Sequence, residues 1–294
     1  MIFDFVPISL EQQDIYLQRL AQCPVVASDY SFANLWGWAE AYGLSWCWQK
    51  DLVWIRQSRP EAALWAPVGP WDKVHWPQIF ADLPSGMRQF CRVPHPLARL
   101  WQRQMGSAVD LDSERDHWDY LYTLSDLVAL KGKRFHKKKN LLNQFVKSYA
   151  FRYQPLDADI LDLVHDLQSD WCTWRDCEAS PMLAAENRAI EKTITAWRQL
   201  RGLMGAALLV KGRMAAYTVG QRLSPDTLVI HFEKGNPEFK GVYQAINQMF
   251  LAHAGGHFRY VNREQDAGDP GLRSAKTSYH PVAFLKKYRV SVSG

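Results

Sequence analysis

Polar and charged side chains are concentrated in the stretch VNREQDAGDPGLRSAKTSYHP, which begins at Val261 at the end of a predicted strand. Residues that follow a strand end project away from the sheet, so we expect these side chains to meet in one cleft. Acyl transfer needs a base, stabilisation of the developing oxyanion and an acid for the leaving oxygen. The candidate catalytic residues are Glu264, Asp266, Arg273, Lys276 and Tyr279, with Asn262 as a substrate-binding residue.

Each type of side chain in this segment suits one part of such a reaction. Glu264 or Asp266 is expected to orient or deprotonate the acceptor. Arg273 and Lys276 are expected to stabilise anionic groups, and Tyr279 to donate a proton. A loop held by internal salt bridges, without a catalytic role, is the alternative interpretation.

A second candidate site is the turn between a predicted strand and helix in the sequence HFEKGNPEFKGVYQ, which begins at His231. Gly235 and Gly241 flank this turn, and a helix start with free backbone N–H groups favours an anion. Lys234 and Lys240 add positive charge there. The turn therefore predicts a substrate-binding site, with an ordinary Gly/Pro/Asn turn as the alternative.

A basic segment, KGKRFHKKKNLLNQFVKSYA, lies near the middle of the chain. Phe135, Leu142, Val146 and Tyr149 recur at helical spacing and predict one buried stripe, with the cations facing away from it. Clustered cations suit a polyphosphate, so nucleic acid, anionic lipid headgroups and a cofactor diphosphate all fit, as does a merely solvated helix face. The candidate anion- or tRNA-binding residues are Lys133, Arg134, Lys137, Lys138 and Lys139.

Tryptophan and cysteine share one predicted loop, WCTWRDC, which joins two helices of the second half. Trp171 and Trp174 are candidate residues of an acceptor pocket, with plain helix packing as the alternative. Cys172 and Cys177 as a redox pair is a weaker interpretation, because the five scattered cysteines follow no signal peptide and indicate a reducing compartment.

Other constellations are less informative. His253 and His257 lie four residues apart, but Gly255 and Gly256 interrupt the helix that would align them, so no metal site is expected. No Ser/His/Asp elbow and no P-loop motif is visible. No apolar run approaches the roughly 20 residues that span a bilayer. We expect a cytoplasmic protein, with peripheral contact at the inner membrane surface left open.

The elements that position these residues occur in one order, twice. The 294 residues favour two domains, and 47% hydrophobic residues suffice for two cores. Each half reads as a strand, two helices, three antiparallel strands, a helix, a strand, a helix and closing strands. Phe3, Phe5, Pro7 and Ile8 are echoed by Phe151, Tyr153, Pro155 and Leu156, which supports an internal duplication. The predicted divisions are residues 1–124, a basic linking helix at 125–149, and a half at 150–294 that we expect to be catalytic.

This element order resembles that of a tandem N-acetyltransferase-like (GNAT) protein, an α+β fold with mixed sheets flanked by helices. The segment from Asn262 to Tyr288, together with GKRFHKKKNLLNQF and SDYSFANLWGW, resembles the C-terminal domain of bacterial phosphatidylglycerol lysyltransferases. The basic helix also resembles the Lys/Arg-rich segment of peptidoglycan-bridging aminoacyl transferases. The resemblance covers nearly the whole chain.

The resemblance implies aminoacyl transfer from an aminoacyl-tRNA to a lipid headgroup, a peptide or a small hydroxyl or amine acceptor. It implicates Asn262, Glu264, Asp266, Arg273, Lys276 and Tyr279 and requires no bound cofactor, with the donor as co-substrate. The multi-span membrane portion of the best-known members is not in this sequence, which leaves an acyl-CoA donor or another acceptor open. The alternatives are an acyl-CoA-dependent N-acetyltransferase and a non-catalytic module that binds RNA or an anionic membrane.

Overall fold

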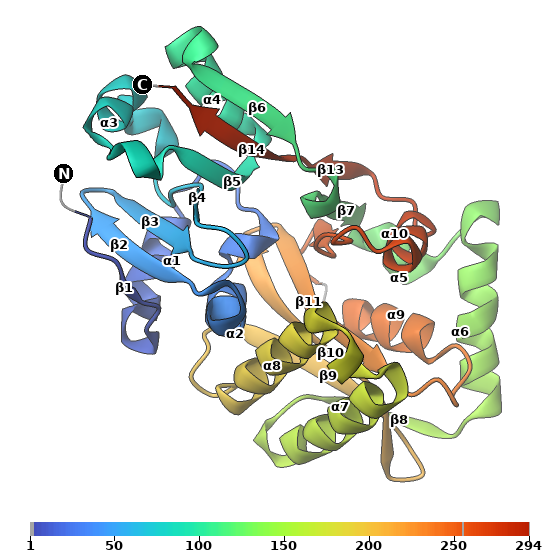
Figure 1. Cartoon of the computed structure of the whole chain (residues 1–294). Coiled ribbons are helices and arrows are strands. Elements are labelled where there is room, and N and C mark those ends of the chain that lie inside the picture. Colours follow the sequence, from blue (N-terminus) through green and yellow to red (C-terminus); the bar gives the residue numbers. More distant parts are fainter. Residues whose placement is uncertain (1–2, 255, 294) are drawn as a thin grey trace. The chain divides into compact units, whose positions relative to one another are not determined.

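The structure is a computed structural model that describes residues 3–254 and 256–293, in which the chain forms two compact units (Figure 1). Unit 1 comprises the chain up to Asp119, Gln265–Pro270 and the residues from Phe284 onward. Unit 2 comprises Tyr120–Glu264 and Gly271–Ala283. Each unit is built on its own seven-stranded sheet.

The sheet of unit 1 has the strand order β1-β2-β3-β4-β5-β14-β6. Its strands are β1 (Val6–Pro7), β2 (Ser45–Gln49), β3 (Leu52–Gln57), β4 (Ala63–Trp65), β5 (Gln89–Pro94), β6 (Val109–Ser113) and β14 (Lys287–Val292). Its helices are α1 (Gln13–Leu20), α2 (Phe32–Tyr42), α3 (Trp76–Asp82) and α4 (His95–Met105).

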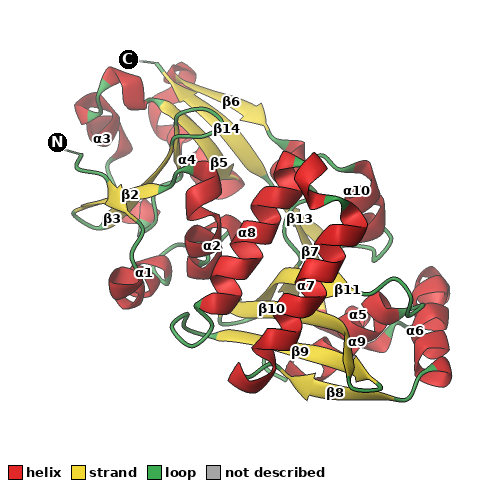
Figure 2. Ribbon diagram, turned by 60° about the horizontal axis from the view of Figure 1, so that its bottom comes forward, coloured by secondary structure: helices red, strands yellow, loops and turns green. Residues whose placement is uncertain are grey.

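The sheet of unit 2, read from its opposite edge, has the order β8-β9-β10-β11-β12-β7-β13. Its strands are β7 (Asp119–Thr123), β8 (Phe151–Pro155), β9 (Leu203–Val210), β10 (Arg213–Ser224), β11 (Thr227–Gly235), β12 (Tyr260–Asn262) and β13 (Ala283–Leu285). The helices are α5 (Leu124–Ala129), α6 (His136–Ser148), α7 (Leu161–Arg175), α8 (Pro181–Thr195), α9 (Val242–Ala254) and α10 (Pro270–Thr277). Figure 2 shows α7 crossing β9 and β10.

The two sheets share one topology, which confirms the predicted repeat. In each, antiparallel strands (β2–β4 and β9–β11) are followed by a parallel neighbour, β5 beside β4 and β12 beside β11. The strands β1 and β8, whose neighbourhoods carry the echoed aromatic and proline residues, form equivalent edges. The α+β class with two mixed sheets flanked by helices, in a tandem GNAT-like arrangement, is therefore confirmed.

Each sheet takes one strand from the other half of the sequence. Strand β14, from the end of the chain, lies between β5 and β6, pairing antiparallel with both (Figure 1). Strand β7, from the first half, pairs antiparallel with β12. The sequence-based division at residue 150 placed the last strand with the second half, and the structure instead assigns it to the sheet of unit 1.

One local expectation was wrong, the course of the buried stripe in the basic segment. Phe135, just before α6, and Phe145 within α6 are fully buried, whereas Val146 is 46% exposed and lies outside the buried stripe. The buried stripe faces α9. Gly241, the residue before α9, lies so close to the backbone of α6 that it has no room for a side chain.

The SDY segment at Ser28 forms a buried polar centre in unit 1. Tyr30 donates its hydroxyl hydrogen to the carbonyl of Arg92 in β5 and accepts a hydrogen bond from the amide of Ala66, just after β4. Its side chain thus bridges the two parallel strands where their backbone pairing ends. Buried polar groups need such partners, so this segment serves the internal architecture of unit 1.

Charged groups are completely buried beside this bridge. Lys287 of β14 forms ion pairs with Asp29 and, at 2.7 Å, with Asp119, and all three side chains are at most 2% exposed. Ser28 donates to Asp119 through both its amide and its hydroxyl group, each at 2.8 Å. Burial by itself would raise the pKa of the Asp29 carboxyl group, but Lys287 and Arg92 outweigh it and hold this pKa well below its usual range. The network anchors the exchanged strand β14 in its sheet.

Candidate functional site

The ends of the parallel strands β11 and β12 bring together a histidine and a carboxylate in unit 2. The Nδ1 atom of His231, in β11, lies 2.8 Å from Oε1 of Glu264, two residues beyond β12. The Glu264 backbone has a φ of 56°, a left-handed conformation that is uncommon for residues other than glycine. Its amide donates to the side-chain oxygen of Asn262 at 2.8 Å. This turn directs the Glu264 carboxylate toward β11.

The other ring nitrogen of His231 is buried and has no hydrogen-bond partner within residues 3–254 and 256–293. Because the Glu264 carboxylate accepts hydrogen bonds, Nδ1 carries the proton, which leaves the lone pair of Nε2 in the neutral ring as an acceptor. An unsatisfied buried polar atom costs about 1–3 kcal/mol, and such exceptions cluster at functional sites. A ligand that donates a hydrogen bond would satisfy this atom. The His231–Glu264 pair is therefore a candidate general base.

A second ion pair supports the strand ends. The Nη2 atom of Arg263 lies 3.1 Å from Oε1 of Glu233 in β11, and Asn247 of α9 donates to the other oxygen of Glu233 at 2.9 Å. The Lys276 ammonium group, in α10, donates to the backbone carbonyl of Arg263 at 2.6 Å. These contacts hold the backbone at Arg263, just before Glu264.

Tyr279 lies in this supporting layer. Burial raises the pKa of its hydroxyl group to about 12, against the lowering effect of the neighbouring Arg263. The Lys138 ammonium group of α6 lies 4.3 Å from the centroid of the Tyr279 ring, and burial together with Arg263 lowers the pKa of Lys138. Tyr279 therefore keeps its proton at neutral pH and contributes hydrogen bonds and a surface for a cation.

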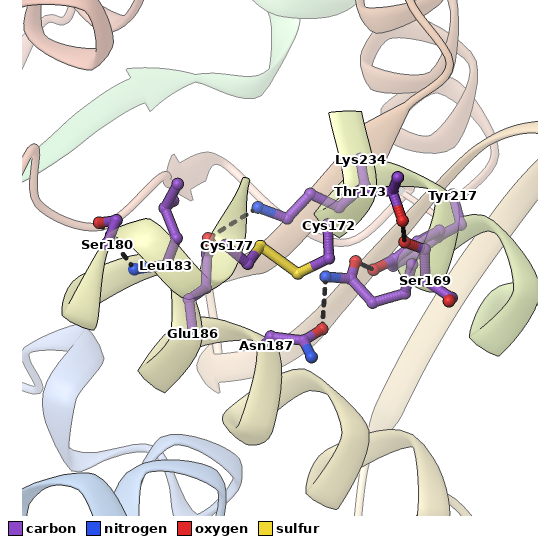
Figure 3. The surroundings of a disulfide bond; sticks show 11 residues. Ser169, Cys172, Thr173, Cys177, Ser180, Leu183, Glu186, Asn187, Tyr217 and Lys234 are labelled. Atoms are coloured by element: carbon purple, nitrogen blue, oxygen red, sulfur yellow. Dashed lines mark hydrogen bonds and ion pairs between the residues drawn. A yellow bond between two sulfur atoms is a disulfide. The ribbon is translucent and has the colours of Figure 1, made fainter. Parts of the chain in front are cut away.

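On the opposite face of the sheet, three predicted substrate-binding residues come together. Lys234 follows Glu233 in β11, so its side chain points toward α7 and α8. Its ammonium group lies 2.8 Å from Oε2 of Glu186 (Figure 3). It lies 3.7 Å from the centroid of the Trp171 ring and is almost completely buried. Trp171 donates its indole hydrogen to the hydroxyl of Tyr243 at 3.2 Å, and Tyr243 donates to the carbonyl of Gly235 at 3.1 Å. Burial lowers the pKa of Lys234, and Glu186 opposes that shift.

The glycines of the strand-to-helix turn are explained by close packing. A Cβ atom at Gly241, where φ is 86°, would lie 2.1 Å from the carbonyl oxygen of Leu141 in α6. A Cβ atom at Gly235 would lie 2.8 Å from a methyl group of Val242. Lys240 is exposed beside them. The turn is thus shaped by its contacts with α6 and α9, and anion binding there stays a prediction.

Three predicted residues remain, Asp266, Arg273 and Trp174. Asp266 belongs to unit 1, where its fully buried carboxylate lies 3.2 Å from a guanidinium nitrogen of Arg115 and accepts from the amide of Gly268. Arg273 is half-buried in α10, and Trp174 is 41% exposed at the end of α7. None of these observations tests a catalytic role.

The basic helix exposes most of its predicted anion-binding residues. Lys133, Arg134, Lys137 and Lys139 are exposed, and Arg134 forms an ion pair with Asp126 at 2.9 Å. Lys138 is half-buried against Tyr279, as described above. The exposed members can meet a polyanion without rearrangement.

The structure also adds residues that the sequence did not single out. His231, Glu186 and Arg263 supply the pairs just described. Alternation in β11 places His231 two positions before Glu233 on one face, so a polar run within an otherwise apolar strand was the available signal. Cys172 and Cys177 form a disulfide, which corrects the interpretation that they are an improbable pair.

Comparison with known proteins places these observations in context. The sequence profile of the family described as "Phosphatidylglycerol lysyltransferase, C-terminal" matches residues 21–291. An uncharacterized protein of Mycoplasmoides gallisepticum is 28% identical over 182 residues, which are 59% of this chain and 56% of that protein. The chain thus spans little more than half the length of that relative.

Two solved structures are similar over nearly the whole chain. A conserved protein of unknown function from Bacteroides thetaiotaomicron has a TM-score of 0.90 at 28% identity, covering 99% of this chain and 100% of that one. The C-terminal domain of a putative lysylphosphatidylglycerol synthetase from Agrobacterium fabrum has a TM-score of 0.65 at 13% identity, covering 97% and 91%. At that identity, the second likeness concerns the fold alone. No helix within the described part of the chain is long and apolar enough to cross a membrane.

Proposed function

Because this chain belongs to the family described as phosphatidylglycerol lysyltransferase, C-terminal, we propose that it transfers an aminoacyl group from an aminoacyl-tRNA to a hydroxyl or amine acceptor. The carrying observation is the buried Nε2 atom of His231, for which the described residues supply no partner, while Glu264 holds Nδ1. An acceptor O–H or N–H group would provide the missing hydrogen bond and place its proton on the base.

The reaction begins when the acceptor oxygen or nitrogen attacks the ester carbonyl carbon of the donor. His231 takes the acceptor proton on Nε2, and Glu264 stabilises the imidazolium through Nδ1–H. When the tetrahedral intermediate collapses, the bond between the carbonyl carbon and the ribose oxygen breaks. His231 returns the proton to that oxygen, so the aminoacyl group ends on the acceptor and the tRNA leaves with a free hydroxyl group.

Other residues act around this pair in the proposal. Lys276 and Arg273 stabilise anionic groups, and Tyr279 acts through hydrogen bonds because its raised pKa makes it a poor acid. Asp266 positions its own loop through Arg115. Lys234, Trp171 and Trp174 shape the acceptor side.

The acceptor class is the least constrained part of the proposal. A lipid headgroup, a peptide and a small amine or hydroxyl compound all present the required nucleophile. A lipid acceptor implies peripheral contact of a cytoplasmic protein with the inner membrane surface. The family description supports the lipid headgroup as the first to be tested.

A donor-consumption screen tests the proposed function. Purified protein is incubated with a panel of charged tRNAs or acyl-CoA thioesters, each with phosphatidylglycerol vesicles, a peptide or a small amine. We expect deacylation of at least one aminoacyl-tRNA that depends on the acceptor, with a product whose mass equals acceptor plus aminoacyl group. Turnover of acyl-CoA without tRNA would identify an acyl-CoA-dependent N-acetyltransferase instead. Binding of RNA or vesicles without any turnover would identify a non-catalytic module.

Binding of tRNA is expected to depend steeply on salt through the exposed lysines of α6. Each lost phosphate contact lowers the slope of log affinity against log salt by about 0.7–0.9. Lys137→Gln together with Lys139→Gln is therefore expected to lower that slope by about 1.4–1.8, measured by filter binding across a salt series.

The matched control is the double variant Lys211→Gln, Arg213→Gln, which removes two exposed cations from the β9–β10 turn of the same unit. It is expected to leave the slope unchanged. Equal slopes for both double variants would refute a specific role of α6.

A further inference from the structure

A disulfide joins the end of α7 to the segment that leads into α8. Cys172 lies in the last turn of α7, and Cys177 begins a short helical turn, Cys177–Ala179, with Cα atoms 5.0 Å apart. Cys172 is partly exposed, whereas Cys177 is buried. The bond closes a short loop at the corner between the two helices.

The other cysteines are poorly suited to redox chemistry. Burial raises the pKa of Cys23 and of Cys91 to about 12 each, so neither forms a thiolate at neutral pH. Cys47 is buried. Within the described residues, thiol chemistry is therefore concentrated at the Cys172–Cys177 corner.

Both helices that meet at this corner contact the same buried lysine. The ring of Trp171, the residue before Cys172, lies against the Lys234 ammonium group. Glu186 of α8 forms the ion pair of Lys234 (Figure 3). A second bond crosses between the helices, because Gln168 donates to Asn187 at 2.9 Å. The environment of Lys234 thus depends on how α7 and α8 are held together.

A buried ammonium group needs both of these contacts. Without the carboxylate of Glu186, the Lys234 charge would lose its one ion pair among the described residues, and desolvation would favour the neutral amine. A neutral or exposed amine reacts with acylating reagents, whereas a buried ion-paired ammonium group does not. Loosening the corner therefore has a chemical consequence at Lys234.

We propose that Cys172 and Cys177 form a reversible thiol–disulfide switch that controls the packing of α7 and α8 around Lys234. In the oxidised form the bond fixes the corner and keeps Trp171 and Glu186 on the lysine. In the reduced form the corner gains conformational freedom and Lys234 becomes accessible. Any effect on transfer rests on the proposed function, in which Lys234 and Trp171 shape the acceptor side, but the effect on Lys234 itself does not.

The switch requires one reductant and one oxidant, and both belong to ordinary thiol–disulfide chemistry. Reduction consumes two electrons and two protons from a protein dithiol, which becomes a disulfide while Cys172 and Cys177 become thiols. Oxidation runs through a small-molecule disulfide of the glutathione class. Thiolate attack by Cys172 forms a mixed disulfide and releases one thiol, and Cys177 then displaces the second thiol.

The test measures Lys234 directly. Oxidised protein, dithiothreitol-reduced protein and the double variant Cys172→Ser, Cys177→Ser are pulse-labelled with an acetylating ester, and Lys234 acetylation is quantified by peptide mass spectrometry. We expect several-fold faster labelling of Lys234 in the reduced protein and in the variant than in the oxidised protein. The variant should not respond to dithiothreitol. Faster hydrogen exchange across residues 171–186 should accompany the change.

Two controls and one independent readout keep the result interpretable. Lys211, exposed in a turn of the same unit, should label equally in all forms, and Cys23→Ser should respond to dithiothreitol like the parent protein. Equal Lys234 labelling in oxidised and reduced protein, with the two redox states confirmed by thiol counting, would overturn the switch. Because labelling needs no substrate, this outcome is separate from a failure to find transferase activity.

Discussion

Replacing His231 by Gln is expected to lower the rate of aminoacyl transfer by about 10²–10⁴-fold, the usual contribution of a general base. The side chain is fully buried, and Nε2 is the ring nitrogen that has no hydrogen-bond partner among the described residues. Gln has a similar length and polarity but cannot take up the acceptor proton. The measurement is kcat for the donor and acceptor identified by the screen, with the thermal midpoint recorded alongside.

The matched control is His253→Gln, because His253 lies in the same unit but is exposed and stacks on Tyr153. That variant should retain the parent kcat. A His231→Gln protein that folds and turns over at the parent rate would remove the base from the mechanism.

Glu264→Gln separates positioning from chemistry. The amide can still contact Nδ1, but it cannot stabilise the imidazolium by charge. We expect a lower kcat with a thermal midpoint close to that of the parent chain. A lower thermal midpoint with an unchanged kcat would instead indicate a purely structural role of Glu264.

Replacing Lys287 by Met is expected to destabilise unit 1 by about 3–5 kcal/mol, the usual effect of leaving a buried charge without its partner. Lys287 pairs with Asp29 and Asp119, and all three side chains are at most 2% exposed. Removing the ammonium group leaves the two buried carboxylates without the cation that both of them contact. Denaturant unfolding measures the loss, and strand β14, which Lys287 begins, should be the first segment to lose hydrogen-exchange protection.

Lys286→Met provides the matched control. Lys286 is the adjacent residue and is exposed, with its ammonium group 5.1 Å from the Trp118 ring centroid. Its replacement should change stability by less than about 1 kcal/mol. In the double variant Lys287→Met, Asp29→Asn the loss should be smaller than the sum of the single losses, because the two substitutions remove both partners of one ion pair. Strict additivity would contradict the ion-pair account.

The pH dependence of stability provides a second check on the same network. The pKa of Asp29 is depressed in the folded protein, so its contribution is present above its unfolded pKa of about 3.9 and is lost as pH falls through the folded value. In Lys287→Met the depression shrinks because one counter-charge is gone. Acid unfolding of the variant should therefore begin at a higher pH than that of the parent chain.

Much of the candidate site was present in the sequence as a density of polar residues. Asn262, Glu264 and Lys276 were identified because a run of charged groups after a predicted strand is unusual. Lys234 and Trp171 were identified from their places beside a turn and a loop. Their neighbours were not, because Glu186 sits in an ordinary amphipathic helix and His231 in a buried strand, where single polar residues resemble many satisfied core positions.

The sequence by itself determined the order of elements, the duplication and the basic helix. These follow from local periodicity, since each helix or strand must bury one face, and that requirement is written into neighbouring residues. Pairing between distant segments does not follow from local periodicity. The exchange of β7 and β14 between the sheets, the burial of Lys287 between two carboxylates and the closure of the Cys172–Cys177 loop depend on which strands and helices meet.

The His231–Glu264 pair shows the same division most clearly. The sequence contains both residues, thirty-three positions apart, and marks one of them as a candidate. Only the parallel register of β11 beside β12, and the left-handed turn at Glu264, place the carboxylate on the imidazole and leave its second nitrogen without a partner among the described residues. Register and turn conformation are set by packing across the whole sheet, so the chemistry proposed for this protein emerges from tertiary structure.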